Sequence, residues 1–319
     1  MILEALKFVR GAVSTKNLLP ELKHFLIRDG HVCGFNGNIA LSSPIDFAIE
    51  CAPKAVPMVQ AIGNCGDVTG LAMTEANRLR IVSGKFKAFI DCVDMRDMPT
   101  PTPQGQVIEF DGAAMMQAIE KLTPFIGNDA SRPWSNGILL RDKSAFATNN
   151  VCLVEYWIGS QLPFTVNIPM AAIKEMARIG EAPLHAQLDE HSMTFHYADG
   201  CWLRTTLYET AWPDLAPILN RPANPVAVPE ALWEALETVK PFVEADNRIY
   251  FRDGAVRTST RDDIGASFDV EGLPDEGVFN IKMLSLLAGV AEKIDFAAYP
   301  APLLFYGNKL RGAIVGQRA

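Results

Sequence analysis

The chain has 319 residues, of which 49% are hydrophobic and 21% are charged, and its formal net charge is −8. This length suits two or three domains with separate cores, and the acidic balance excludes a protein that simply coats nucleic acid. No uninterrupted apolar run approaches the ~20 residues that span a bilayer, so we expect no membrane segment.

The elements in chain order repeat a unit of helix, strands, helix and strands. Apolar side chains three or four residues apart predict the first helix of each unit, at Leu6, Val9 and Val13, at Met115, Ile119 and Leu122, and at Leu232, Leu236 and Val239. A second helix is expected in each unit, over 56–62, 170–179 and 283–290. Asn280 suits the N-cap of the last one. A second hairpin then closes each unit, with turns at 83–85, 199–200 and 307–308.

A strand–turn–strand segment between the two helices is the clearest sign of repetition. It reads Leu-Ile-Arg-Asp-Gly at 26–30 and returns in similar form at 139–143 and 250–254, roughly 110 residues apart. Proline-rich stretches at 98–103 and 219–225 fall where this repeat predicts boundaries. We therefore predict an α+β chain of three repeated domains, 1–103, 104–221 and 222–319, each with two helices packed on antiparallel sheets.

Motifs of catalytic sites are absent from the sequence. There is no glycine-rich phosphate loop and no GxSxG nucleophile elbow. His185, His191 and His196 lie close in sequence, but their spacing favours half-exposed strand residues over a metal site. Six cysteines without CxxC spacing, and an N-terminus without a secretory signal, indicate a cytoplasmic protein with reduced thiols. We expect no enzyme, no cofactor and no metal.

Isolated basic residues accompany most of the expected helices. They are Lys7, Arg10, Lys54, Lys121, Lys174, Arg178, Lys282 and Lys293. If the helices share one side, an acidic protein presents one basic surface. The alternative is that these are ordinary solvated residues of helix surfaces, and Glu230, Glu234 and Glu237 on the fifth helix favour that interpretation.

Five short segments in chain order carry a family resemblance. SGKF at 83–86 with DMP at 97–99 is similar to the motif SGR…DFP, and ATNNVCL at 147–153 is similar to ATDGHRLA. VNIP at 166–169 is similar to VIVP, and WPDLAPI at 212–218 is similar to FPDYRRV. FNIKML at 279–284 is similar to FNVKYLLD. These are motifs of the bacterial DNA polymerase III beta subunit, or beta sliding clamp. The resemblance spans essentially the whole chain in register.

The resemblance implies three DNA-clamp domains in a non-enzymatic protein. In this family the three domains make one crescent, and two crescents close head to tail into a ring around double-stranded DNA that tethers the replicative polymerase. The inside of such a ring needs bases that attract phosphates without reading sequence. The resemblance assigns this role to Lys7, Arg10, Lys16, Lys54, Lys121, Arg132, Trp134, Lys174, Arg178 and Lys282.

The resemblance also implies a pocket that receives short apolar peptide motifs of the DNA polymerase and the clamp loader. Its wall would include Ser135, Thr148, Asn150, Leu153, Pro213, Ile218 and Val315. Asn150-Val151-Cys152 stands where the family has Gly-His-Arg, and 315–319 stands where it has Met-Pro-Met-Arg-Leu. These departures allow a smaller pocket or one that reads a different peptide.

Other functions stay open at the level of sequence. One is a clamp-derived interaction protein that no longer encircles DNA, and another is an enzyme with an unrecognised site among the strands. The family points to a homodimer, with a monomer or another ring stoichiometry as alternatives. The departures suggest a divergent clamp, from a phage or a plasmid.

Overall fold

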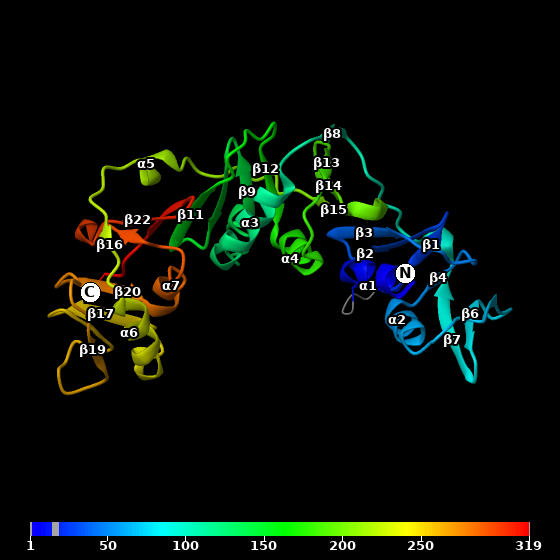
Figure 1. Ribbon diagram of the computed structural model, residues 1–319, viewed down its shortest axis with the longest axis horizontal. Coiled ribbons are helices and arrows are strands. Elements are labelled where there is room, and N and C mark those ends of the chain that lie inside the picture. Colours follow the sequence, from blue (N-terminus) through cyan, green and yellow to red (C-terminus); the bar gives the residue numbers. More distant parts are fainter. Residues whose placement is uncertain (1, 15–18, 319) are drawn as a thin grey trace. The chain divides into compact units, whose positions relative to one another are not determined.

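The computed structural model describes residues 2–14 and 19–318 and consists of helices packed on antiparallel sheets (Figure 1). It divides into two compact units. The first comprises Met1–Met116 and Ile168–Tyr208, and the second comprises Gln117–Asn167 and Glu209–Ala319. Each unit therefore takes part of the middle third of the chain, and the domain borders 1–103, 104–221 and 222–319 stay a prediction.

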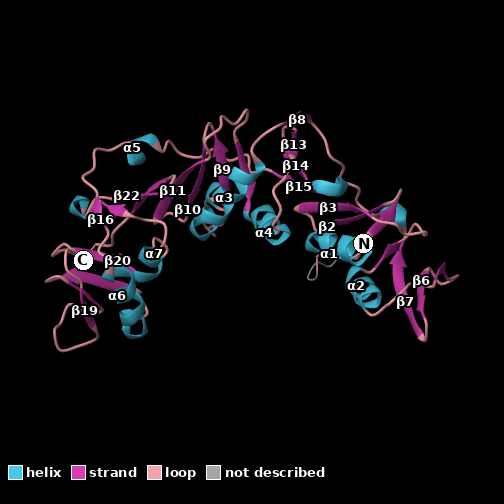
Figure 2. Cartoon of the chain, viewed as in Figure 1, coloured by secondary structure: helices cyan, strands magenta, loops and turns pink. Residues whose placement is uncertain are grey.

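The helices occur near the positions that the apolar spacing predicts (Figure 2). They are α1 (Ile2–Val9), α2 (Ala55–Gly63), α3 (Gly112–Leu122), α4 (Met170–Ile179), α5 (Ala216–Leu219), α6 (Ala231–Val239) and α7 (Ile281–Ser285). The side chain of Asn280 caps α7 by accepting from the backbone N–H groups of Lys282 and Met283. The helix expected over 283–290 is wrong in its extent: the chain after Ser285 continues as turns with i→i+3 bonds, such as Val290 N to Leu287 O at 3.1 Å.

The first unit is built on two antiparallel sheets. A seven-stranded sheet has the order β1-β2-β3-β15-β14-β13-β8, and a four-stranded sheet has the order β4-β7-β6-β5. The strands of the larger sheet are β1 (Leu26–Arg28), β2 (His31–Phe35), β3 (Ile39–Pro44), β8 (Gln106–Ile108), β13 (His185–Leu188), β14 (Ser192–His196) and β15 (Trp202–Thr206). Those of the smaller sheet are β4 (Ala52–Pro53), β5 (Gly70–Met73), β6 (Arg78–Ser83) and β7 (Phe86–Val93).

The second unit follows the same plan. An eight-stranded sheet has the order β12-β9-β10-β11-β23-β22-β21-β16, and a four-stranded sheet has the order β19-β18-β17-β20. The larger sheet contains β9 (Gly137–Arg141), β10 (Ser144–Thr148), β11 (Cys152–Trp157), β12 (Val166–Pro169), β16 (Val226–Ala227), β21 (Lys293–Ile294), β22 (Leu303–Gly307) and β23 (Leu310–Ile314). The smaller sheet contains β17 (Arg248–Arg252), β18 (Ala255–Arg257), β19 (Ser267–Asp269) and β20 (Gly277–Asn280).

The three copies of the repeated segment all form hairpins, as the sequence predicts. They join β1 to β2, β9 to β10 and β17 to β18. Each turn places an aspartate in the left-handed region, with φ of 52° at Asp29, 56° at Asp142 and 54° at Asp253. Aspartate tolerates this conformation better than most residues because its short side chain bonds locally. The shared aspartate therefore suits the backbone conformation of each turn.

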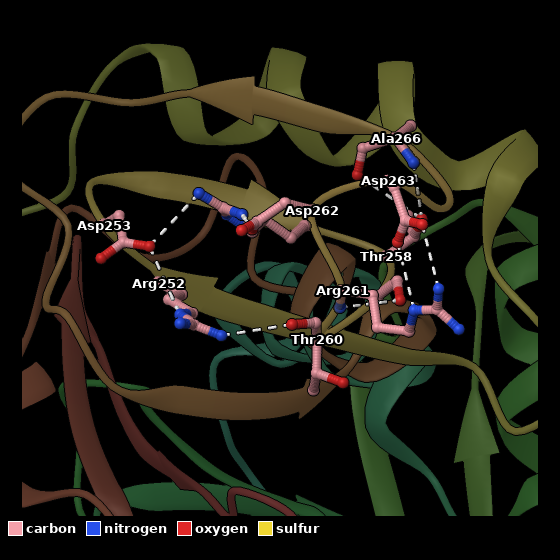
Figure 3. A network of polar contacts seen from close by, with 10 residues as sticks. Arg252, Asp253, Thr258, Thr260, Arg261, Asp262, Asp263 and Ala266 are labelled. Carbon is pink, nitrogen blue, oxygen red and sulfur yellow. Dashed lines mark hydrogen bonds and ion pairs between the residues drawn. The ribbon is translucent and has the colours of Figure 1, made fainter.

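A loop between β18 and β19 is held in shape by ion pairs (Figure 3). Arg257 pairs with both Asp253 and Asp262, and Arg261 pairs with Asp263 at 2.9 Å. Exposed pairs of this kind contribute at most about 1 kcal/mol each, so they order the loop more than they stabilise the fold. The loop presents Ile264, whose side chain is 47% exposed.

Candidate functional site

Two neighbouring helices of the first unit present basic side chains. Lys7 on α1 and Lys174 on α4 are exposed, as are Arg10 and Arg178. The Arg178 guanidinium donates from Nη2 to the carbonyl oxygen of Phe8 at 2.6 Å, at the C-terminal end of α1. A cation is favourable there because the helix dipole leaves partial negative charge on the last carbonyls. Arg178 thus joins α4 to α1 and brings these bases together.

A buried carboxylate orients Arg178. Arg178 Nε donates to Glu175 Oε1 at 2.6 Å, and Glu175 is only 7% exposed. The carboxylate fits because position 11 is glycine: a Cβ there would lie 1.7 Å from Glu175 Oε1. Gly11 therefore makes room for the ion pair between Glu175 and Arg178.

Lys54 occupies a position that helix stability does not explain. It is exposed and stands at the N-cap of α2, with no side-chain capping bond. A positive charge at a helix N-terminus is unfavourable by about 0.3–1 kcal/mol. Lys282 is also exposed, in the first turn of α7, whereas Lys121 is exposed in the last turn of α3, where the dipole favours it. Lys16 lies outside the described residues.

Arg132 and Trp134, predicted to contact DNA, lie together at an apolar pocket of the second unit. Arg132 Nη1 donates to Asn150 Oδ1 at 2.9 Å. The Trp134 ring is half-buried, packs edge-on against Trp212 and forms part of the pocket wall. Sequence reasoning grouped these two residues with the helix bases as DNA contacts. The structure adds that Trp134 lines the pocket, and the contact of both residues with DNA stays a prediction.

The pocket has a volume of about 180 Å³ and a mainly apolar wall. Its lining side chains come from the ends of β10, β11 and β23, from the segment around α5, and from the loops before β9 and β22. They are Trp134, Thr148, Asn150, Val151, Cys152, Leu153, Pro213, Leu215, Ile218, Pro302, Ala313 and Val315. The strand register sets Thr148 opposite Leu153, and Leu153 opposite Ala313. These side chains therefore share one face of the sheet. Burial raises the pKa of the Cys152 thiol to about 12, so Cys152 is a neutral, apolar part of the wall.

The turn between β10 and β11 is fixed by its own side chains. Asn149 Oδ1 accepts from the N–H groups of Val151 at 3.1 Å and Cys152 at 2.8 Å. Thr148 Oγ1 donates to the Cys152 carbonyl at 2.8 Å and accepts from Asn150 N at 3.1 Å. Asn150 has φ of 69°, a left-handed conformation that asparagine and glycine tolerate. The replacement of the clamp family's glycine by Asn150 is therefore compatible with the backbone.

The segment around α5 closes the side of the pocket. Leu215 and Leu219 pack with Leu139, Phe146 and Leu153 in one buried cluster. This contact holds α5 on the sheet and leaves Ile218 38% exposed at the pocket wall. Val315, just after β23, is 43% exposed on the same wall. These exposed side chains leave the pocket open to solvent.

No protein-family model matches the sequence, and no curated protein matches it. Solved structures do match. The Caulobacter crescentus beta sliding clamp has a TM-score of 0.83 at 18% identity, and the Pseudomonas aeruginosa DnaN sliding clamp bound to griselimycin has 0.84 at 17%. The beta subunit of Streptococcus pyogenes DNA polymerase has 0.81 at 18%. Each match covers 99% of this chain and 97% of the other.

The fold is that of a bacterial beta sliding clamp. The likeness extends over nearly the whole chain and confirms the fold class that the five sequence segments indicated. In this clamp fold, most of the predicted wall residues do meet: Thr148, Asn150, Leu153, Pro213, Ile218 and Val315 line one pocket.

Ser135 is the exception among the predicted wall residues. It is fully buried and does not line the pocket; its Oγ donates to the Arg132 carbonyl at 2.9 Å. Its role is to hold the loop that carries Trp134. Sequence reasoning missed Leu215 and Ala313, which strand alternation and the apolar spacing around 215–219 could have indicated. It also missed Pro302, for which the sequence carries no local signal.

Among the described residues, no helix has both the length and the apolar composition of a membrane span. The same part of the chain contains no cluster of histidine, cysteine and carboxylate side chains arranged to hold a metal ion. His185 and His196 stack with ring centroids 4.6 Å apart, and His196 Nε2 lies 2.8 Å from Gln187 Oε1. These histidines are paired within the sheet.

Proposed function

We propose that this protein is a DNA sliding clamp, a non-enzymatic ring subunit that encircles double-stranded DNA and tethers a replicative polymerase. The likeness in fold to beta sliding clamps along nearly the whole chain is the observation that carries the proposal. A second observation supports the proposal: an accessible apolar pocket is lined by most of the residues that the family resemblance named. We propose three repeated clamp domains, with borders at 103 and 221.

The exposed bases supply the DNA-facing surface in this proposal. Lys7, Arg10, Lys54, Lys174 and Lys282 are exposed in a chain whose net charge is −8. Non-specific contacts to phosphates give weak, salt-dependent attraction, which permits sliding. The unfavourable position of Lys54 at a helix N-terminus supports a role outside helix stability. Arg178 is largely committed to Glu175 and α1, and Arg132 and Trp134 serve the pocket.

The pocket takes short apolar peptide segments of a DNA polymerase and of a clamp loader in this proposal. Its wall is apolar, and Ile218 and Val315 are exposed at its opening. Buried apolar anchors of this kind carry most of the free energy of a small interface. The free cysteines suit a reducing compartment, and we place the protein in the cytoplasm.

Closure of the ring requires an exposed surface near the turn at Gly84. Phe89 on β7 is 57% exposed, with the bases Arg80 and Lys87 beside it on the same face. The last third of the chain exposes Phe242 and the acids Glu234 and Glu237. We propose that these apolar and oppositely charged surfaces meet between two copies of the chain and form a homodimer.

Retention on DNA of different topology tests the proposal. Subunits are dissociated by dilution, mixed with nicked circular plasmid and concentrated so that rings close around the DNA. A clamp stays on the circle in high salt and is released when the plasmid is cut, because only topology then holds it. Equal retention on circular and linear DNA would contradict encirclement. Peptide binding without topological retention would instead favour a clamp-derived interaction protein.

A further inference from the structure

The apolar pocket is the first of three hollows along one face of the eight-stranded sheet. Leu153, Glu155 and Trp157 alternate along β11 and therefore share this face. Leu153 lines the pocket, Glu155 lines a second hollow of about 200 Å³, and Trp157 lines a third of about 400 Å³. On β23, Ala313 lies opposite Leu153, and Arg311 lies opposite Glu155. The hollows thus follow the strand direction.

The three hollows share their walls. Leu215 lines both the pocket and the second hollow, and Glu155 and Arg311 line both the second and the third. Leu153 and Trp157 are four residue steps apart along the strand, a length of about 13 Å. An extended peptide of similar length therefore reaches from the pocket to Trp157. We name the second and third hollows together the polar track.

The floor of the polar track is a fixed ion pair. Arg311 Nε donates to Glu155 Oε2 at 2.6 Å, and the Ser144 hydroxyl donates to Glu155 Oε1 at 2.7 Å. Arg311 also reaches Asn220 Oδ1 at 3.2 Å, next to α5. Arg141, Asp142 and Asp214 also line the second hollow. The middle of the track is therefore a polar floor on which two arginines face three carboxylates, so it offers no separate site for an acidic side chain of the peptide.

The far end of the track has a different character. The Trp157 ring is 50% exposed and lies with Tyr306 and Lys309 around the third hollow. Trp157 N donates to the Lys309 carbonyl at 2.8 Å, which fixes the two residues side by side. Lys309 is exposed and forms no ion pair with a described residue. The exposed ring of Trp157 offers a contact for an apolar side chain of a bound peptide, and the ammonium group of Lys309 beside it offers one for a carboxylate.

We propose that the partner peptide seated in the pocket continues along the polar track, with an apolar side chain against Trp157 and an acidic side chain at Lys309. This inference rests on the proposed function of the pocket. The shared wall at Leu215 and the span of about four strand residues make the occupant the flank of that same peptide. The track therefore determines which partner peptides bind most tightly.

Selection from a displayed library of random peptides, each long enough to span pocket and track, tests this proposal. A selected peptide is synthesised whole and as a truncated form that keeps only its apolar core. Both are titrated against the native protein and against Trp157→Ala, Lys309→Glu and Ile218→Asp. Lys85→Glu, which also changes an exposed lysine of a hairpin turn, is the matched control. Melting temperatures verify that each variant folds.

The whole peptide is expected to bind the native protein about tenfold more tightly than its core. Trp157→Ala and Lys309→Glu should remove this difference and leave core binding intact, while Lys85→Glu changes neither. Equal affinity of whole and truncated peptides for the native protein would overturn the inference and leave the pocket function standing. Core binding that is insensitive to Ile218→Asp would overturn both. Binding of oligothymidine that is lost in Trp157→Ala would assign the track to single-stranded nucleic acid and also overturn the inference.

Discussion

Trp134 lies edge-on to Trp212, with ring centroids 5.1 Å apart and ring planes inclined by 62°. Aromatic pairs in this arrangement contribute about 0.5–1.5 kcal/mol beyond their buried area. The contact joins the loop before β9 to the segment before α5 and forms one wall of the pocket. The pocket is thus held open by packing between two segments far apart in sequence.

Ile218→Asp should weaken binding of a selected core peptide at least about tenfold, because it places a charge in the apolar wall. Ile218 is 38% exposed, so the melting temperature should change little. Isothermal titration measures the affinity. Ile264→Asp, at a residue that is 47% exposed away from the pocket, is the control. Leu153→Ala is a poorer test, because Leu153 packs with Leu139 and Phe146 and its truncation would cost ~2–5 kcal/mol of folding stability.

Gly11→Ala should destabilise the first unit by about 1–3 kcal/mol, because the new methyl group displaces the Glu175 carboxylate from Arg178. Chemical denaturation gives the change in the free energy of unfolding. Gly66→Ala is the control, since a Cβ there meets no atom within 4 Å. A loss of the same size in both variants would show that the glycine matters through backbone freedom rather than through Glu175.

Phe89→Asp should convert the dimer to a monomer, because it places a charge on the apolar surface proposed for ring closure. Phe89 is 57% exposed, so the fold should survive. Phe86, the other residue considered for this surface, is half-buried and less suitable. Sedimentation or light scattering measures the mass. Val107→Asp changes another exposed apolar residue (55% exposed) and should leave the mass unaltered; an unchanged mass in Phe89→Asp would count against this interface.

Lys54→Asp should have opposite effects on stability and on DNA association. Aspartate is a preferred N-cap and suits the helix dipole, so the free energy of unfolding should rise by about 0.5–1 kcal/mol. DNA association should weaken and its salt dependence should become shallower, because one phosphate contact is lost. Denaturation and salt-dependent binding measure the two effects. Lys143→Asp, at an exposed lysine in the turn between β9 and β10, should change neither, and a Lys54→Asp variant with native DNA association would remove Lys54 from the DNA surface.

Acidification from neutral pH should destabilise the fold, partly through His196. Burial, and then the neighbouring His185, lowers the pKa of His196 below its usual value of about 6.5. The unfolded chain therefore binds more protons than the folded one in the range between the two pKa values. Stability is then full above about 6.5 and falls as the pH drops below it. His196→Phe should flatten the pH dependence of the melting temperature; an unaltered slope would exclude this contribution.

Much of the fold could be predicted from the sequence because the signals are local. The hairpin turns depend on left-handed aspartates such as Asp29 and Asp142, and the apolar spacing at Leu6 and Val9 follows from one buried helix face. The extent of the last helix could not be predicted, because residues after Ser285 satisfy the same apolar spacing with i→i+3 turns.

The candidate site was predicted less completely because it depends on contacts between distant residues. The resemblance located Thr148, Leu153 and Pro213, whose segments match family motifs, and it located Val315 although the segment 315–319 departs from the family motif. It grouped Trp134 with the bases predicted to contact DNA and gave no sign of its place in the pocket wall, since its packing on Trp212 is a tertiary contact. Ser135 sits one residue further along the same loop, and only the structure shows that it points behind the wall.

The pairing of β15 with β3, and of β11 with β23, has a consequence for dividing the chain. Both β11 and β15 belong to the middle third, and each pairs with a strand of another third within one sheet. A fragment cut at 103 and 221 would expose two unsatisfied strand edges, which invite aggregation. The repeated sequence pattern therefore does not mean that each third folds by itself. Backbone hydrogen bonds join the thirds, and a cut would leave those donors and acceptors without partners.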